Sequence, residues 1–333
     1  MSRAFNLGAI MDYIKVVAPA HLHVGNIDLT GDLGRLYGTV GFTIDYPRTV
    51  VEIECSEKFT VIGRDSASAV NYARKALKFL GLEDKGAYVR IKEAIPKHVG
   101  LGSQTALALS IGLGLAKLYG VKVDIKALAL ALGRSTISAL GLYSFTKGGF
   151  IVDGGFKIEK KGEMIPPLIF NYPIPDDWFF VVAIPQKPLP RILSIKSKEK
   201  EILDSLKPMP KEFSGKVSRI VLMQMLPAMV EKDIKVFGKA ITLFNKALGE
   251  FWREKQGGIY CDPIVEEGIE LLLKEGAYGA CQTSWGPTFY GLVKGESKAK
   301  ELAELLKKFI YKKGGGYVFY TKGNNRGALI VLK

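Results

Sequence analysis

The sequence predicts an α/β protein with two domains. Segments with the two-residue alternation of strands and segments with helical spacing follow one another along the chain. The 333 residues exceed an average domain of roughly 100–200 residues, and four prolines between residues 162 and 176 indicate a boundary. We therefore expect one domain at residues 11–160 and another at residues 176–333. A content of 47% hydrophobic and 24% charged residues excludes a disordered or fibrous chain.

The first half begins with two expected strands, at residues 12–24 and 42–55, which alternate and are rich in β-branched residues. The glycines of residues 25–41 predict turns between them. A helix is expected at residues 66–81, because apolar residues recur there every three or four positions. A strand is expected to follow at residues 87–95.

A Gly-rich loop then runs directly into an apolar helix that ends at Gly120. Its small and apolar residues on all sides predict a buried helix. A second helix is expected at residues 123–133, and residues 134–149 lead from it to a strand at residues 150–155.

The second half is expected to begin with a buried strand at residues 177–185. The segment 188–216 is polar, Lys-rich and interrupted by prolines, which fits a solvated connection or a mobile lid over an anionic ligand. The remaining pattern predicts three helices, at residues 217–230, 233–253 and 262–275. A strand is expected after them at residues 278–293, then a helix at residues 299–310 and a last strand at residues 316–332. The ten residues before Met11 predict a disordered extension.

The net charge points to anionic partners. Lys and Arg number 47 against 33 Asp and Glu, a net charge of +14, which attracts anions to the surface. The basic residues are scattered in small groups, without the long runs or interleaved aromatic residues of a nucleic-acid surface. We therefore expect phosphorylated small molecules as substrates and no nucleic-acid partner.

The sequence also predicts a cytoplasmic location. No apolar run approaches the roughly 18 residues of a membrane span, and the N-terminus lacks the apolar segment of a secretion signal, so we expect no membrane partner. The three cysteines, Cys55, Cys261 and Cys281, form no CxxC pair, which fits a reducing compartment. About a dozen Asn and Gln residues beside abundant Lys and Glu fit a protein from a hot environment.

The strongest local signal is the Gly-rich loop before the apolar helix, here called the phosphate loop. It consists of Gly100, Leu101, Gly102, Ser103, Gln104 and Thr105. Its glycines let the backbone approach a ligand, and the helix start offers unpaired amides and a partial positive charge to a phosphate. Ser103 and Thr105 can add hydroxyl contacts to phosphate or to phosphate-bound magnesium, and Lys97 and His98 can add positive charge. The alternative is an ordinary turn in which Ser103 caps the helix and Lys97 is only solvated.

Common nucleotide-binding patterns are missing. The sequence contains neither GxxxxGK[ST] nor a strand-linked GxGxxG with an acidic partner about 20 residues further on. Any phosphate site in this chain therefore belongs to another fold.

Three segments resemble, in the expected order, the three motifs of the GHMP kinase superfamily, which includes galactokinase, homoserine kinase and mevalonate kinase. They are APAHLHVGNID at residues 18–28, PKHVGLGSQTALAL at residues 96–109 and YGACQTSWGPTFYGL at residues 278–292. The resemblance implies an α/β GHMP-kinase fold. In that fold, an N-terminal domain like ribosomal protein S5 domain 2 carries the phosphate loop, a ferredoxin-like C-terminal domain follows, and ligands bind between the two.

Within the superfamily, four segments resemble the β-ribofuranosylaminobenzene 5′-phosphate (β-RFAP) synthases, which are archaeal enzymes of methanopterin biosynthesis. They are LHVGNIDLTGDLGRLYGTVG, HVGLGSQTALAL, FTKGGFIVDGG and CQTSWGPTFYG. The chain departs from that family at His21, where Arg is usual, at Asn26, and at Gln104, Thr105 and Ala106. The resemblance implies a transferase that condenses phosphoribosyl pyrophosphate with p-aminobenzoate or p-hydroxybenzoate. It also implies release of carbon dioxide and pyrophosphate, and the use of Mg²⁺.

Two alternatives stay open: an ATP-dependent GHMP kinase acting on a sugar or alcohol, and an inactive ligand-binding protein. Many kinases of the superfamily place a catalytic Asp in an S-G-x-D segment shortly before a Gly-Gly pair, whereas this chain has Gly141 at the matching position. Glycine can neither orient nor deprotonate a hydroxyl group, which argues against the kinase. A homodimer is a further expectation from the family.

The expected catalytic residues are Asp28, Arg35 and Ser103. Asp28 can coordinate magnesium or a ribose hydroxyl, or it can cap a turn. Arg35 matches a Gly-Arg pair of the family and is expected to hold a phosphate or carboxylate through its planar fork; the alternative is a surface arginine.

Substrate contacts are expected from three further segments. Asp153 ends a strand beside two glycines, where it can reach the cleft or start a turn. His23 is expected to contact the ligand or to pack, and its pairing with His21 lacks the further ligands of a metal site. Trp285 can stack on a ring or ribose, or pack in the core. It belongs to a rigid polar turn that consists of Gln282, Thr283, Ser284, Trp285 and Gly286.

Overall fold

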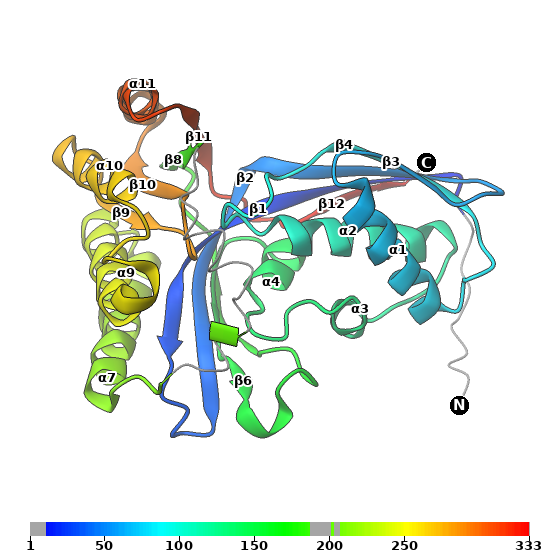
Figure 1. Cartoon of the computed structure of the whole chain (residues 1–333), viewed down its shortest axis with the longest axis horizontal. Coiled ribbons are helices and arrows are strands. Elements are labelled where there is room, and N and C mark those ends of the chain that lie inside the picture. Colours follow the sequence, from blue (N-terminus) through cyan, green and yellow to red (C-terminus); the bar gives the residue numbers. More distant parts are fainter. Residues whose placement is uncertain (1–10, 187–200, 203–206, 333) are drawn as a thin grey trace.

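The computed structural model describes residues 11–186, 201–202 and 207–332. The chain forms a long, bent N-terminal sheet and a smaller C-terminal sheet, with helices packed against both (Figure 1). The extension expected at residues 1–10 and most of the connection expected at residues 188–216 lie outside the described residues. Within the described ranges, no helix is long and apolar enough to cross a membrane.

The N-terminal sheet contains eight strands in the described part of the chain. Their order is β12-β1-β2-β4-β3, with β5 and β6 paired to β2 and β7 paired to β5. The pairs are antiparallel except for β3 with β4. The bounds are Tyr13–Asp28 (β1), Arg35–Cys55 (β2), Thr60–Gly63 (β3), Ala87–Glu93 (β4), Phe150–Asp153 (β5), Phe156–Lys157 (β6), Leu168–Tyr172 (β7) and Leu329–Leu332 (β12).

β1 and β2 form a long hairpin that bends away from the rest of the sheet (Figure 1). The turns expected across residues 25–41 are therefore largely strand. A Cβ atom at Gly25 would overlap the side chain of Leu248, and one at Gly41 would overlap that of Leu140. These two glycines let neighbouring helices pack directly onto the strands, a role that a sequence pattern does not distinguish from turn formation.

Helices cover one face of the N-terminal sheet (Figure 1). Their bounds are Ser66–Leu80 (α1), Ser103–Leu118 (α2), Ile125–Ala131 (α3) and Leu140–Thr146 (α4), and a short 3₁₀ turn, η1, follows at Ile158–Lys160. α2 is buried along nearly its whole length, as its composition predicts. α4 is not predicted, because its seven residues are stabilised from a distance: the Ala139 amide at its start donates to Asp153 Oδ2 at 2.9 Å.

The C-terminal sheet has the order β11-β8-β10-β9. Its strands are Trp178–Pro185 (β8), Gly279–Gln282 (β9), Phe289–Lys294 (β10) and Gly316–Lys322 (β11). Helices α10 (Pro263–Lys274) and α11 (Glu296–Lys312) cover one face of this sheet with their own apolar cluster. The other face joins the N-terminal core, where the Phe42 ring lies 5.1 Å from that of Phe180.

The remaining helices lie beside the β1–β2 hairpin (Figure 1). The helix expected at residues 217–230 starts earlier, at α7 (Lys211–Ile220), and continues through a π-helical turn, η2 (Val221–Met225), into α8 (Leu226–Glu231). α9 spans Ile234–Gln256. It begins where Asp233 accepts hydrogen bonds from the Lys235 and Val236 amides, and ends at Gly257 with a φ of 94°.

The two halves are more closely joined than the expected boundaries imply. β7 lies inside the expected linker 162–176 and pairs with β5. β12 lies inside the expected second domain but pairs with β1. The chain therefore returns to its first sheet at the end, and one apolar core extends across both halves.

Candidate active site

The three motifs meet along the edge of β1 that β12 leaves open. β12 pairs only with residues 14–17 of β1. Further along, the His21 amide donates to the Leu101 carbonyl at 3.2 Å, and the Ser284 amide donates to the His23 carbonyl at 3.2 Å. The phosphate loop and the turn after β9 thus form hydrogen bonds with backbone groups at this edge of β1, as a neighbouring strand would.

Thr283 connects all three motifs. Its Oγ1 accepts a hydrogen bond from the His23 amide at 2.8 Å and donates one to the Gly100 carbonyl at 2.8 Å. Thr283 is fully buried and does not line the cavity, and its expected substrate contact stays a prediction. Its role is to position the loop and the turn against β1.

A cavity of about 740 Å³ opens at this junction. It is lined by the β1–β2 hairpin, the start of α2, the segment between α3 and α4, the end of α9 and the turn after β9. Most of the predicted site residues lie in its wall: His23, His98, Gly100, Gly102, Ser103, Gln104, Thr105, Gln282, Ser284 and Trp285.

The phosphate loop has the conformation of an anion site. Gly102, with a φ of 78°, is the N-cap of α2, no side chain caps the helix, and its first turn holds no acidic residue. The alternative in which Ser103 is the cap is therefore wrong. A Cβ atom at Gly102 would overlap the His21 ring, so the loop can approach β1 only with glycine here. Leu101 is 1% exposed and anchors the loop in the core.

Lys97, before the loop, and Gln104, within it, have partners in the protein. Lys97 Nζ forms an ion pair with Asp65 at 2.8 Å and donates to Ser68 Oγ at 3.1 Å, and Lys97 does not line the cavity. Gln104 Oε1 accepts a hydrogen bond from the Tyr72 hydroxyl at 3.0 Å. A phosphate contact by Lys97 would require this ion pair to open.

Asp28 and Arg35 lie at the tip of the β1–β2 hairpin, beyond the residues that line the cavity. Asp28 Oδ1 accepts hydrogen bonds from the amide and the hydroxyl of Thr30, both at 2.7 Å. Arg35 donates to the carbonyls of Gly154 and Gly155, both at 2.8 Å. Both side chains support the hairpin in this arrangement, and their expected catalytic roles stay predictions.

Asp153 has no exposed surface and does not line the cavity. Its carboxylate accepts hydrogen bonds from the amides of Thr39, Ala139 and Gly155, at 3.1, 2.9 and 3.0 Å. Burial nevertheless raises the pKa of Asp153 to about 6. The hairpin and the start of α4 enclose this carboxylate, so a substrate contact would require them to move, and the expected contact stays a prediction.

The turn after β9 is held by an amide network. Gln282 Oε1 accepts from the Cys261 amide at 2.8 Å, and its Nε2 donates to Gln256 Oε1 at 3.3 Å. Gly286 is buried and does not line the cavity, and its expected ligand contact stays a prediction. Trp285 is 9% exposed and lies against Trp252, with ring centroids 4.7 Å apart.

Several cavity residues were not predicted as ligand contacts. Arg134 and Ser135 come from the segment before α4, and Trp252 and Tyr260 come from the region around the end of α9. The only sequence signal for Arg134 is that it begins a short polar segment, residues 134–136, directly after an apolar helix. Nothing near Trp252 in the sequence marks it as different from a core residue of a long helix.

The two histidines of β1 are neutral. Burial lowers the pKa of His21 to about 3 and that of His23 to about 4. The described residues contain no cluster of three His, Cys, Asp or Glu side chains that can hold a metal ion. The pair therefore offers neutral ring nitrogens to a ligand.

Carboxylates are missing from the cavity. None of its lining residues, all in the described part of the chain, is Asp or Glu. At the position that corresponds to the catalytic Asp of many GHMP kinases, a Cβ atom on Gly141 would lie 2.9 Å from Thr105 Cβ and 3.2 Å from His21 Cε1. An Asp side chain does not fit there unless these neighbours move.

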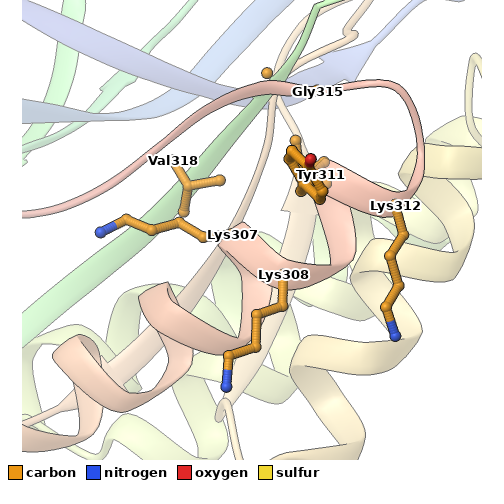
Figure 2. A pocket seen from close by; sticks show the side chains of 8 residues that line it. Lys307, Lys308, Tyr311, Lys312, Gly315 and Val318 are labelled. Carbon is orange, nitrogen blue, oxygen red and sulfur yellow. The ribbon is translucent and has the colours of Figure 1, made fainter.

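A second cavity of about 510 Å³ lies between α11 and β11 and is lined by none of the motif residues. Figure 2 shows that the side chains of Lys307, Lys308 and Lys312 point in different directions. Because these cations do not converge on a common point, we assign no function to this cavity.

Comparison with known proteins gives consistent results. The model of the GHMP kinases N terminal domain matches residues 68–148, and that of the GHMP kinases C terminal matches residues 225–312. The β-ribofuranosylphenol 5′-phosphate synthase of Methanothermobacter thermautotrophicus is 32% identical, over 94% of this chain and 97% of that protein. The enzyme of the same name from Archaeoglobus fulgidus is 29% identical, over 95% of this chain and 99% of that protein.

A solved structure supports the fold independently. The homoserine kinase of Cytophaga hutchinsonii has a TM-score of 0.71 and 18% identity, and the match covers 97% of this chain and 99% of that one. The motifs, the fold and the match over nearly the full length lead to one conclusion: this chain belongs to the GHMP kinase family, in its branch of β-ribofuranosylphenol 5′-phosphate synthases.

Proposed function

We propose that this protein is a phosphoribosyl transferase that joins C1 of phosphoribosyl pyrophosphate to the ring of 4-hydroxybenzoate. The products are a ribofuranosylphenol 5′-phosphate, carbon dioxide and pyrophosphate, as in the synthesis of methanopterin-type cofactors. The names of the archaeal relatives support this reaction and favour a hydroxyl rather than an amino group on the ring. p-Aminobenzoate is the second acceptor to be tested.

The observation that carries the proposal is that the described residues lining the cavity include no Asp or Glu. A kinase that phosphorylates an alcohol uses a group that orients or deprotonates the hydroxyl. The proposed reaction has no such requirement, because the electron-rich ring is the nucleophile. The C1–oxygen bond breaks with its electron pair going to pyrophosphate, and the ring carbon para to the hydroxyl forms the bond to C1. The bond to the carboxyl group then breaks and returns its electron pair to the ring.

The cavity walls suit the two substrates. The start of α2 and the hydroxyls of Ser103 and Thr105 provide donors for a phosphorylated ligand. The C-terminal side is aromatic and apolar, with Trp252, Tyr260 and Trp285 in the wall. Rings of this kind hold a planar acceptor by stacking or edge contacts.

An uncharged acceptor site also favours the loss of carbon dioxide. A carboxylate transferred from water to apolar surroundings loses solvation, and the neutral product does not. The aromatic wall therefore destabilises the reacting carboxylate relative to carbon dioxide.

We propose that Mg²⁺ enters together with the diphosphate of the donor. Since the described residues that line the cavity include no carboxylate, the hydroxyls of Ser103 and Thr105 are the protein groups that would hold the ion there. When bound, the ion would neutralise charge on the diphosphate. Asp28 is a proposed ligand only if the hydrogen bonds to Thr30 open.

Other properties follow from the same proposal. The three cysteines are free, which supports a reducing cytoplasm. A homodimer and function at high temperature remain expectations, to be tested by light scattering and by thermal unfolding.

The test is mass spectrometry of the products after the protein is incubated with Mg²⁺, phosphoribosyl pyrophosphate and either 4-hydroxybenzoate or p-aminobenzoate. The proposal expects a riboside phosphate that lacks the carboxyl carbon. The matched control contains Mg-ATP and a mixture of sugars and alcohols. Formation of ADP and a phosphorylated alcohol in the control, with no riboside in the main reaction, would establish the kinase alternative instead.

A further inference from the structure

The segment between α3 and α4 brings a cation to the start of α2. Arg134 lies in this segment, and its Nε donates a hydrogen bond to Thr105 Oγ1 at 3.2 Å. Thr105 belongs to the first turn of α2, where the amides lack a capping side chain. The guanidinium and the helix start therefore face the same region of the cavity.

Arg134 is the only Lys or Arg among the described residues that line the cavity. None of the described carboxylates forms an ion pair with it, and no described group accepts a hydrogen bond from its Nη atoms. It is partly buried, so its charge is poorly screened by water. A partly buried cation without a protein counterion favours an anionic ligand.

Ser135 provides a second, independent indication of a ligand. Ser135 is 8% exposed and lines the cavity, yet no group in the described part of the chain forms a hydrogen bond with its buried Oγ. Its φ of 61° lies in the left-handed region. A buried hydroxyl without a protein partner is unfavourable, and left-handed backbone at a residue other than glycine is found mostly at functional sites.

We propose that Arg134 and Ser135, together with the start of α2, bind the diphosphate group of the phosphoribosyl donor. Arg134 stabilises the negative charge that this group gains as it leaves C1. This assignment rests on the proposed function and adds the residues that accelerate the departure of pyrophosphate.

Chemistry argues for the diphosphate rather than the acceptor's carboxylate as the partner of Arg134. Negative charge grows on the leaving pyrophosphate, so a fixed cation there is worth more in the transition state than in the ground state. A cation on the benzoate would instead stabilise the carboxylate that must be lost. Arg134 is also hydrogen-bonded to the first turn of α2, not to the aromatic wall.

The test compares wild type with Arg134→Ala, Arg134→Lys and Ser135→Ala. The control is Arg74→Ala, which removes the same charge from the exposed face of α1. The measurements are kcat, the KM for each substrate, and the inhibition constant and direct binding of inorganic pyrophosphate with Mg²⁺, the last by isothermal titration. Thermal unfolding reports whether each variant is folded.

Arg134→Ala is expected to lower kcat by about 10²–10³, to weaken pyrophosphate binding at least about tenfold, and to leave the KM for the acid within about twofold. The kcat and the pyrophosphate affinity of Arg134→Lys should lie between those of wild type and Arg134→Ala, because lysine keeps the charge but lacks the planar fork of the guanidinium. Ser135→Ala should weaken pyrophosphate binding by about threefold to tenfold without lowering the midpoint of unfolding, since it removes an unpaired hydroxyl.

A raised KM for the acid with unchanged pyrophosphate binding would overturn the assignment, and so would an Arg134→Ala enzyme that behaves like Arg74→Ala. If wild type makes no riboside phosphate but binds pyrophosphate in an Arg134-dependent way, the proposed function fails and the diphosphate site stands. If wild type makes the product and pyrophosphate binding is independent of Arg134, only the present assignment fails.

Discussion

At the scale of single residues, Gly102 sets how closely the phosphate loop approaches β1. A Cβ atom there would overlap the His21 ring, and the φ of 78° disfavours other residues. Gly102→Ala is expected to reduce product formation at least about tenfold and to lower thermal stability, because the loop must move away from β1. Initial rates and unfolding curves measure both effects.

The matched control is Gly81→Ala at the end of α1. Gly81 has a φ of 69°, and nothing lies within 4 Å of its added Cβ atom. This variant carries the backbone strain of about 1–2 kcal/mol without the overlap, and should keep full activity. Equal activity of the two variants would mean that the contact between Gly102 and His21 does not matter for the site.

Trp252 tests the aromatic wall. Its ring lies 4.7 Å from that of Trp285 in the cavity. Trp252→Ala is expected to raise the KM for the aromatic acid by about 2–12-fold, the value of one aromatic contact, and to leave the KM for phosphoribosyl pyrophosphate unchanged. Trp252→Phe is the control: it keeps an aromatic ring, so its KM for the aromatic acid should rise less. A change only in the KM for phosphoribosyl pyrophosphate would mean that the aromatic acid binds elsewhere.

The sequence predicts the backbone of the phosphate loop well because its signal is local: two glycines are followed directly by a helix. It does not predict Arg134 or Trp252, since both reach the cavity only after distant elements have packed. Asp153 shows the opposite case. Its Asp-Gly pair is compatible with a side chain in a cleft or with a turn. Only the folded structure, in which three amides donate to the carboxylate, distinguishes these two possibilities.

At the scale of elements, the hydroxyl of Thr283 joins β1, the phosphate loop and the turn after β9. Thr283→Val has the same shape but leaves the buried His23 amide without its partner. We expect a loss of about 1–3 kcal/mol in unfolding free energy and weaker pyrophosphate binding, measured by urea denaturation and titration. Thr283→Ser keeps the hydroxyl and is the control. Unchanged stability of the valine variant would contradict this role.

The strands and long helices are predicted where their periodicity is local. The Gly-rich part of the β1–β2 hairpin is not, because Gly25 and Gly41 serve helices that pack on the strands from far along the chain. α4 is missed for a related reason: its first amide is satisfied by Asp153, after the helix in sequence.

At the scale of the whole molecule, the buried histidines couple stability to pH. His21 and His23 have pKa values of about 3 and about 4 in the folded protein, against 6.5 when exposed. The unfolded chain therefore binds more protons between pH 6.5 and about 4, and stability falls as the pH is lowered through this window. Asp153 acts in the opposite direction between pH 3.8 and about 6, because its folded pKa is raised.

The contribution of one histidine can be isolated with His23→Gln. The unfolding free energy of wild type and variant is measured in urea across the mildly acidic range up to neutral pH. The slope of the unfolding free energy against pH should be smaller for the variant by up to about 1.4 kcal/mol per pH unit, which is the value for one proton. Parallel pH curves would show that His23 is not held neutral by the fold.

The most direct test of the proposed reaction uses 4-hydroxybenzoate labelled in its carboxyl carbon, with phosphoribosyl pyrophosphate and Mg²⁺. We predict one labelled carbon dioxide and one pyrophosphate for each riboside phosphate formed, and no label in that product. Label retained in the product would contradict bond formation at the ring carbon that carries the carboxyl group. No labelled gas, together with ADP formed from ATP and an alcohol, would contradict the transferase itself.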